Sequence, residues 1–146
     1  MKPSKKCIDL IKKFEGLFLK SYLCPANVAT IGYGSTIWSD GKKVKLGEVI
    51  SLEGAEKLLM WELEKKSVCL QDLNLNQNQF DALLSFIYNI GVGAFKKSTI
   101  LKMIKLNPTD KGIREQFMRW VNKGSTFEKG LTRRRKEEAD LYFIIT

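Results

Sequence analysis

The chain has 146 residues, of which 44% are hydrophobic and 10% aromatic, a composition that suits one folded domain and excludes an intrinsically disordered chain. Its formal net charge of +9 favours an anionic partner, and charge alone does not choose among nucleic acid, anionic lipid and bacterial wall polymer. The absence of histidine and the three widely spaced cysteines argue against a zinc site and a disulfide framework. We therefore expect reduced thiols, no metal and no cofactor.

The N-terminal segment has the pattern of a short amphipathic helix. Apolar residues recur at helical spacing from Lys5 to Phe14, and Ser4 is placed as the N-cap. Asp9, Lys12 and Lys13 interrupt the apolar positions, so we expect no signal peptide. No window approaches the length of an apolar membrane span, and we expect no stable membrane insertion.

The segment from Leu17 to about Leu46 has a different character. Glycines and turn residues accumulate there, and alternation of apolar and polar residues replaces the helical period. The sequences Pro25-Ala26-Asn27 and Asp40-Gly41 are typical of hairpin turns. This segment is therefore predicted to form a small antiparallel sheet.

Beyond Glu48 the pattern is helical almost to the end. Ser51 is a candidate cap for a helix with an apolar face, and Asn76 with Gln79 forms a candidate capping box for a helix that stops at Gly91. Further helices are expected over residues 98–105, 110–121 and 132–142.

This order of elements predicts an α+β protein with a single domain over residues 1–146. A β-rich lobe of about residues 15–50 should follow the first helix, and a mainly α-helical lobe should comprise about residues 51–146 with the N-terminal helix. An active-site cleft between the lobes would accommodate an elongated substrate.

Three residues, Glu15, Cys24 and Thr30, are candidates for one catalytic site. The turn at residues 25–27 folds Cys24 and Thr30 towards each other, and the end of the first helix presents Glu15 to the same space. A helix C-terminus carries partial negative charge, and apolar flanks such as Phe14 add desolvation, so both favour a protonated Glu15. A protonated carboxyl can donate to a glycosidic oxygen, whereas a solvent-exposed Glu with no such role is the ordinary alternative.

The spacing from Glu15 through Cys24 to Thr30 resembles the catalytic signature of the phage-type lysozymes, the endolysins of T-even and lambdoid phages. Ordered blocks from about residue 8 to residue 143 extend the resemblance: 31–34, 79–83, 88–91, 98–99, 117–120, 130–131 and 134–142. The resemblance implies a lysozyme-like fold. It also implies a glycoside hydrolase that cleaves the β-1,4 bonds between N-acetylmuramic acid and N-acetylglucosamine in peptidoglycan.

Carried over residue by residue, the resemblance implies Glu15 as the general acid, with Cys24 and Thr30 handling the water or nucleophile on the opposite sugar face. The middle position is commonly Asp in the family and Cys in some members. Cys24 can act as a thiolate or only help to place a water, and a buried, merely packed thiol is the plain alternative. The sequence leaves open whether the reaction inverts or retains the anomeric centre.

Gly32, Tyr33 and Gly34 are candidate substrate-binding residues, because glycines let a backbone approach a ligand closely; a tight turn is the alternative. Of the three consecutive arginines, Arg134 fits the family spacing best as a residue that faces Glu15 across the cleft. Ser35 stands where many family members carry His, which removes an imidazole from the cleft.

The resemblance implies peptidoglycan glycan strands as the partner and a monomer as the active form, with no nucleic acid. It also implies synthesis in the host cytoplasm, and a separate holin for release to the cell wall or periplasm. A lytic transglycosylase or a non-catalytic wall binder would fit the same residues. A nucleic-acid-binding module fits the charge and the basic run at residues 133–136, but the acidic residues that follow interrupt this run.

Overall fold

The computed structural model describes residues 1–145, which form two compact units. The first, unit 1, comprises Met1–Ile8 and the chain from Lys66 onward, and the second, unit 2, comprises Asp9–Lys65. The β-rich lobe expected at about residues 15–50 thus lies inside unit 2, which also takes in most of the first two helices. Each unit is described on its own below.

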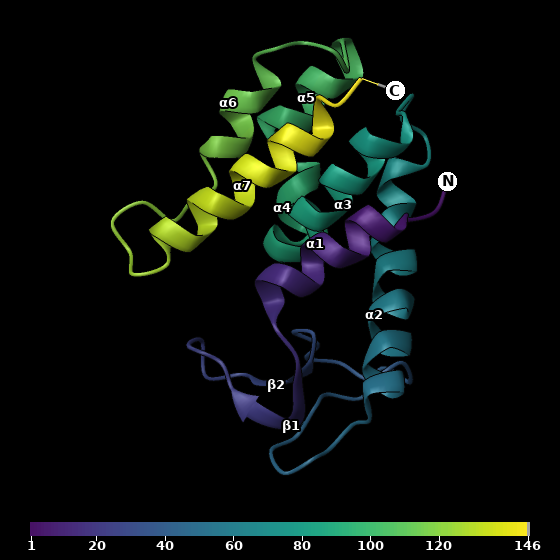
Figure 1. Ribbon diagram of the computed structural model, residues 1–146, viewed down its shortest axis with the longest axis vertical. Coiled ribbons are helices and arrows are strands. Elements are labelled where there is room, and N and C mark those ends of the chain that lie inside the picture. The colour runs from purple at the N-terminus through teal and green to yellow at the C-terminus, as the bar shows by residue number, and fades with distance from the viewer. Residues whose placement is uncertain (146) are drawn as a thin grey trace. The chain divides into compact units, whose positions relative to one another are not determined.

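Unit 2 contains the small antiparallel sheet that the sequence predicted. Helix α1 (Lys5–Glu15) is followed by strands β1 (Phe18–Leu23) and β2 (Ala29–Gly32), which are labelled in Figure 1. Tyr22 pairs with Thr30 and Leu23 with Ala29, and the register shifts between Phe18 and Tyr22. An antiparallel sheet directly after the first helix is the predicted arrangement.

Helix α2 (Leu52–Lys66) closes unit 2. The Ser51 hydroxyl accepts from the Gly54 amide at 2.9 Å, which confirms Ser51 as the cap of this helix. The buried face of α2 has the residues expected from the sequence, namely Ala55, Leu58, Leu59 and Leu63. Leu58 packs with Ile31 and Val44 in a hydrophobic cluster, against which the half-buried Trp38 and Trp61 also lie.

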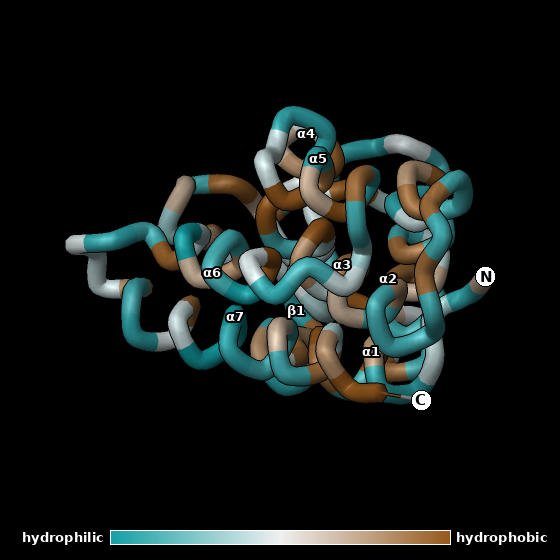
Figure 2. The backbone as a smooth tube through the Cα atoms, turned by 90° about the horizontal axis from the view of Figure 1, so that it is seen from above, coloured by the Kyte–Doolittle hydropathy of each residue, from teal (hydrophilic) through white to brown (hydrophobic). Residues whose placement is uncertain are grey.

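Unit 1 is almost entirely helical. Its elements are the short 3-10 helix η1 (Ser67–Leu70), α3 (Gln77–Ile90), α4 (Val92–Lys96), α5 (Thr99–Leu106), α6 (Ile113–Met118) and α7 (Glu128–Tyr142). Helix α7 packs against α3 and α6, and α6 against α5, as the green and yellow ribbons of Figure 1 show. Figure 2 shows α7 mostly in the hydrophilic colour, which agrees with its run of charged residues.

Two helix starts in unit 1 follow their predicted caps. Asn76 accepts from the Gln79 amide at 2.8 Å while the Gln79 side chain accepts from the Asn76 amide at 2.9 Å, which is the expected capping box. Helix α3 then ends before Gly91, whose φ of 93° is open to glycine and strained for other residues. The Ser98 hydroxyl caps α5 by accepting from the Leu101 amide at 3.2 Å.

Two predictions about helix ends are wrong in detail. The helix expected over residues 110–121 is shorter, because the Asp110 carboxylate accepts from the Gly112 amide at 2.8 Å and holds a turn ahead of α6. The helix expected from residue 132 begins earlier, at Glu128. Ser4 occupies the predicted N-cap position before α1, where its carbonyl accepts the first helical bond from Ile8, and its hydroxyl donates a short hydrogen bond to Asp81 of α3.

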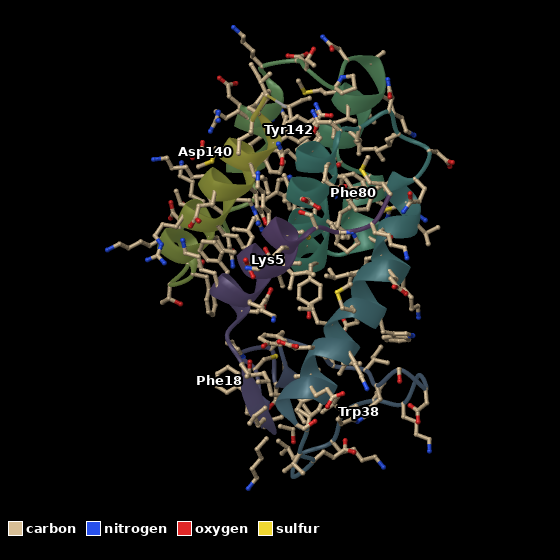
Figure 3. The ribbon with its side chains drawn as sticks, turned by 45° about the vertical axis from the view of Figure 1, so that its right-hand side comes forward. Lys5, Phe18, Trp38, Phe80, Asp140 and Tyr142 are labelled. Atoms are coloured by element: carbon tan, nitrogen blue, oxygen red, sulfur yellow. The ribbon has the colours of Figure 1, made fainter. Side chains whose placement is uncertain are left out.

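The core of unit 1 combines aromatic rings with buried charge. The Phe86 ring contacts Phe117 at a centroid distance of 5.1 Å and Trp120 at 5.8 Å. The guanidinium of Arg135 lies over the same Phe86 ring at 5.0 Å, and Arg135 is 1% exposed. Figure 3 labels Tyr142, whose ring contacts Phe117 at 5.8 Å. Arg135 also pairs with the buried Glu138 carboxylate at 2.7 Å, so a salt bridge is built into the hydrophobic core.

Candidate active site

Glu15 is the last residue of helix α1, and the glycine that follows fixes this end. The Gly16 amide donates to the Lys12 carbonyl at 3.1 Å, and Gly16 has a φ of 72°. A left-handed residue at this place stops the helix and turns the chain into β1. The Glu15 side chain is half-buried at this turn.

Cys24 and Thr30 lie on the hairpin between β1 and β2. The Cys24 amide donates to the Val28 carbonyl at 3.0 Å, and the Asn27 amide donates to the Cys24 carbonyl at 2.8 Å. Asn27 takes the left-handed conformation with a φ of 64°, which closes the tight turn expected at Pro25-Ala26-Asn27. Thr30 is buried, and its hydroxyl donates to the Val28 carbonyl at 2.9 Å.

The hairpin stabilises the ionised form of the Cys24 thiol. Hydrogen bonding to the Val28 backbone lowers the pKa of Cys24 most, and the Ala26 backbone and the Thr30 hydroxyl lower it further against the opposing effect of burial. Hydrogen bonds to a charged form favour that form. The Cys24 thiol therefore ionises at a lower pH than an ordinary cysteine does.

Tyr22 is a site residue that the sequence analysis missed. It pairs with Thr30 across the sheet, and its ring contacts the Phe18 ring at a centroid distance of 4.4 Å. Burial raises the pKa of Tyr22 most, and the charges of Cys24 and Glu15 raise it further. The electrostatic effects of Glu15 and Cys24 therefore converge on one tyrosine. The signal available in the sequence was the position of Tyr22 near the end of the predicted strand, two residues before Cys24.

The Gly32-Tyr33-Gly34 segment forms a tight turn with both glycines at positive φ, 66° and 97°. A Cβ added to Gly32 would lie 3.5 Å from the Ala55 Cβ of helix α2. The Tyr33 ring is buried, and the Lys12 ammonium lies over it at 5.2 Å. Packing thus accounts for these residues, and their contact with substrate stays a prediction.

Arg134 lies in unit 1, on helix α7, and is 3% exposed. Its Nε donates to the Glu138 carboxylate at 3.1 Å, and its Nη2 donates to the Ser85 carbonyl at 3.0 Å. Arg135 is also buried and Arg133 is exposed, so two of the three consecutive arginines are core residues. A substrate-binding role for Arg134 stays a prediction.

Within residues 1–145, no group of three or more histidine, cysteine or acidic residues is arranged to hold a metal ion. The helices of the same described segment are all too short or too polar to cross a membrane.

A family model named phage lysozyme matches residues 12–138 of this chain. An endolysin of Acyrthosiphon pisum secondary endosymbiont phage 1 is 40% identical over 147 residues, which cover 95% of this chain and 96% of that protein. An endolysin of Salmonella phage P22 is 37% identical over 142 residues, which cover 95% of this chain and 97% of that protein.

Solved structures agree with these relatives. An endolysin from Escherichia coli O157:H7 phage FAHEc1 superposes with a TM-score of 0.86 at 39% identity, covering 98% of this chain and 94% of that chain. The muramidase domain of SpmX from Asticaccaulis excentricus superposes with a TM-score of 0.84 at 30% identity and covers 99% of both chains. These matches confirm the lysozyme-like α+β fold predicted from the sequence. The chain belongs to the phage lysozyme family.

Proposed function

We propose that this chain is an endolysin that hydrolyses the β-1,4 bonds between N-acetylmuramic acid and N-acetylglucosamine in peptidoglycan, with Glu15 as general acid. The observation that carries the proposal is the match of the phage lysozyme family model to residues 12–138, a segment that contains Glu15, Cys24 and Thr30. The charges of Glu15 and Cys24 also act on one tyrosine of unit 2, Tyr22. Breaking an acetal needs a proton on the leaving oxygen and a nucleophile at the anomeric carbon. A carboxyl can supply the proton, and a thiolate can activate a water as the nucleophile.

In this proposal Glu15 gives its proton to the glycosidic oxygen as the bond to the anomeric carbon breaks. A water molecule held near Cys24 and Thr30 attacks that carbon and releases its proton to the Cys24 thiolate. The Val28 amide and the Thr30 hydroxyl favour that thiolate. Tyr22 pairs with Thr30 across the sheet, and the charges of both Glu15 and Cys24 act on its phenol.

The names of the relatives support the same activity. The curated relatives are named endolysins, and one structural neighbour is named a muramidase domain. The term muramidase describes cleavage at N-acetylmuramic acid, which is the bond that we assign to this chain. We further propose that the active form is a monomer, that the enzyme reaches the wall from the host cytoplasm with the help of a separate holin, and that its function involves no nucleic acid.

The test is a glycan digest with two matched variants. Glu15→Gln keeps the shape of the side chain and loses the acidic proton, so we expect lysis of purified wall to fall by about a hundredfold or more. Glu53→Gln, at an exposed carboxylate of helix α2 in the same unit, should leave lysis unchanged. Both variants should keep the wild-type circular dichroism spectrum. Appreciable wall lysis by Glu15→Gln would remove Glu15 from the mechanism.

Mass spectrometry of the digest separates the alternative reactions. A free reducing N-acetylmuramic acid end indicates hydrolysis, whereas a 1,6-anhydro end indicates a transglycosylase, in which a sugar hydroxyl replaces water. An absence of soluble fragments despite wall binding would indicate a non-catalytic wall binder. Either of the latter two results would overturn the proposed hydrolysis.

A further inference from the structure

A pocket lies in unit 2, on the loop between β2 and α2. Its volume is about 550 Å³, and its lining includes Trp38, Asp40, Lys42, Lys43, Lys45 and Glu48. Figure 3 labels Trp38 on this loop. None of these residues belongs to the group around Tyr22, so the proposed catalysis leaves the pocket unexplained.

The backbone of this loop is held in place. The Trp38 amide donates to the Lys42 carbonyl at 2.8 Å, and the Val44 amide donates to the Thr36 carbonyl at 2.9 Å. Val44 is 5% exposed and belongs to the hydrophobic cluster of unit 2. Successive side chains of an extended segment point to opposite sides, so Lys43 and Lys45 both point away from that cluster.

Both acidic residues of the pocket are engaged by the loop itself. Glu48 accepts from the Trp38 indole at 3.1 Å and from the Lys45 amide at 2.6 Å, and these donors, the amide first, lower the pKa of Glu48. Asp40 accepts from the Lys42 amide at 2.9 Å.

Three lysines remain around the pocket, and their side chains are all exposed. Within residues 1–145, the ammonium groups of Lys42 and Lys43 pair with no carboxylate. The positive charge of the Lys45 ammonium lowers the pKa of Glu48. The pocket therefore presents cationic donors on a fixed backbone, which is the arrangement that an anion requires.

We propose that this pocket binds a phosphate group of a phosphorylated glycan or polyol polymer of the bacterial envelope. Lysine ammonium groups bind phosphate as point charges and adapt to its tetrahedral oxygens. The volume exceeds that of one phosphate and leaves room for the sugar or polyol that carries it. Such a contact would keep the enzyme at a phosphate-rich envelope while the separate group around Tyr22 acts on the glycan.

Nucleic acid is the other polymer that offers phosphates. Single strands are bound by aromatic rings open for stacking and by a basic track along the backbone. Here Trp38 packs against the hydrophobic cluster, and the lysines surround one pocket formed by the eleven residues from Trp38 to Glu48. These features favour a local phosphate site over a nucleic-acid track.

The first test locates the site by NMR. Amide chemical shifts of the Glu15→Gln protein, which leaves the polymers intact, are followed during titration with glycerol phosphate oligomers and with a phosphorylated lipopolysaccharide oligosaccharide. We expect the largest changes between Trp38 and Glu48 with at least one of the two, and the comparison identifies the source of the phosphate. The same changes with the dephosphorylated compounds, or equal affinity for a DNA oligonucleotide of matched charge, would overturn the proposal.

The second test uses charge-matched variants. Lys42→Gln/Lys43→Gln should weaken binding of the phosphorylated polymer by about tenfold and reduce its salt dependence. Lys102→Gln/Lys105→Gln removes the same charge from exposed positions of α5 and should change affinity by less than about twofold. Equal losses in both pairs would mean a general charge effect and no site. Cleavage of phosphate-free glycan should be unchanged in both pairs, so the outcome is independent of the proposed catalysis.

Discussion

Replacing the buried Glu138 carboxylate of helix α7 with an amide should destabilise unit 1 strongly, although the side chain keeps nearly the same shape. It is 0% exposed and accepts from Arg135 at 2.7 Å, from Arg134 at 3.1 Å and from the Ser85 hydroxyl at 2.6 Å. Glu138→Gln keeps the volume but leaves two buried guanidinium groups without that negative charge. Breaking a buried ion pair in this way costs about 3–5 kcal/mol, because the remaining charge is desolvated.

Urea unfolding followed by circular dichroism measures this loss. With an m-value of about 2 kcal/mol/M, a loss of about 4 kcal/mol lowers the midpoint by about 2 M urea. The matched control is Asp140→Asn on the same helix, labelled in Figure 3. Asp140 also pairs with an arginine at 2.7 Å, but Asp140 and Arg114 are 53% and 43% exposed. That exposed pair should contribute less than about 1 kcal/mol. Equal losses in the two variants would refute the argument from burial.

Three further predictions concern ionisation. Alkylation of Cys24 should begin at lower pH than that of Cys69, because the Val28 backbone lowers the pKa of Cys24 while burial raises that of Cys69; peptide mass spectrometry measures both, and equal midpoints would contradict this. Glu15→Gln should lower the pKa of Tyr22, because the Glu15 charge disfavours the phenolate; an unchanged NMR titration of labelled tyrosine would place Glu15 away from it. Burial first, and then nearby carboxylates, raise the pKa of Cys7, so only the unfolded state ionises this thiol as pH rises. The Cys7 contribution to the free energy of unfolding should therefore fall by up to about 1.4 kcal/mol per pH unit above the ordinary cysteine pKa, and Cys7→Ala should make the pH dependence in urea titrations less steep.

Local signals in the sequence predicted the elements that local contacts determine. The Asn76–Gln79 capping box and the Ser51 cap each join residues three apart, so the pattern contains both partners. The turn after Cys24 needs only a residue that tolerates positive φ, and Asn27 is one. Glu15 and Cys24 were identifiable as candidates because their spacing resembles a known family signature.

Long-range contacts account for what the sequence did not predict. The partner of the Ser4 hydroxyl is Asp81, 77 residues away, and no local pattern indicates it. The run at residues 133–136 has the composition of a solvated surface, yet Arg135 is buried because Glu138 and the Trp120 carbonyl accept from it. The place of Tyr22 beside Glu15 depends on how β1 leaves the helix, which periodicity does not specify.

Unit 1 is built from two segments that are far apart in the sequence, and this affects how it forms during synthesis on the ribosome. The Ser4 amide and hydroxyl bond to Asp81, and Gln77 donates to the Lys2 carbonyl at 2.7 Å, so residues 2–4 pack with helix α3, which is translated more than 70 residues later. Closing so long a loop carries an entropic cost that is recovered only when both ends are present. Unit 1 therefore completes its packing late in translation or after release, whereas the contiguous Asp9–Lys65 segment can fold while the rest is still being made.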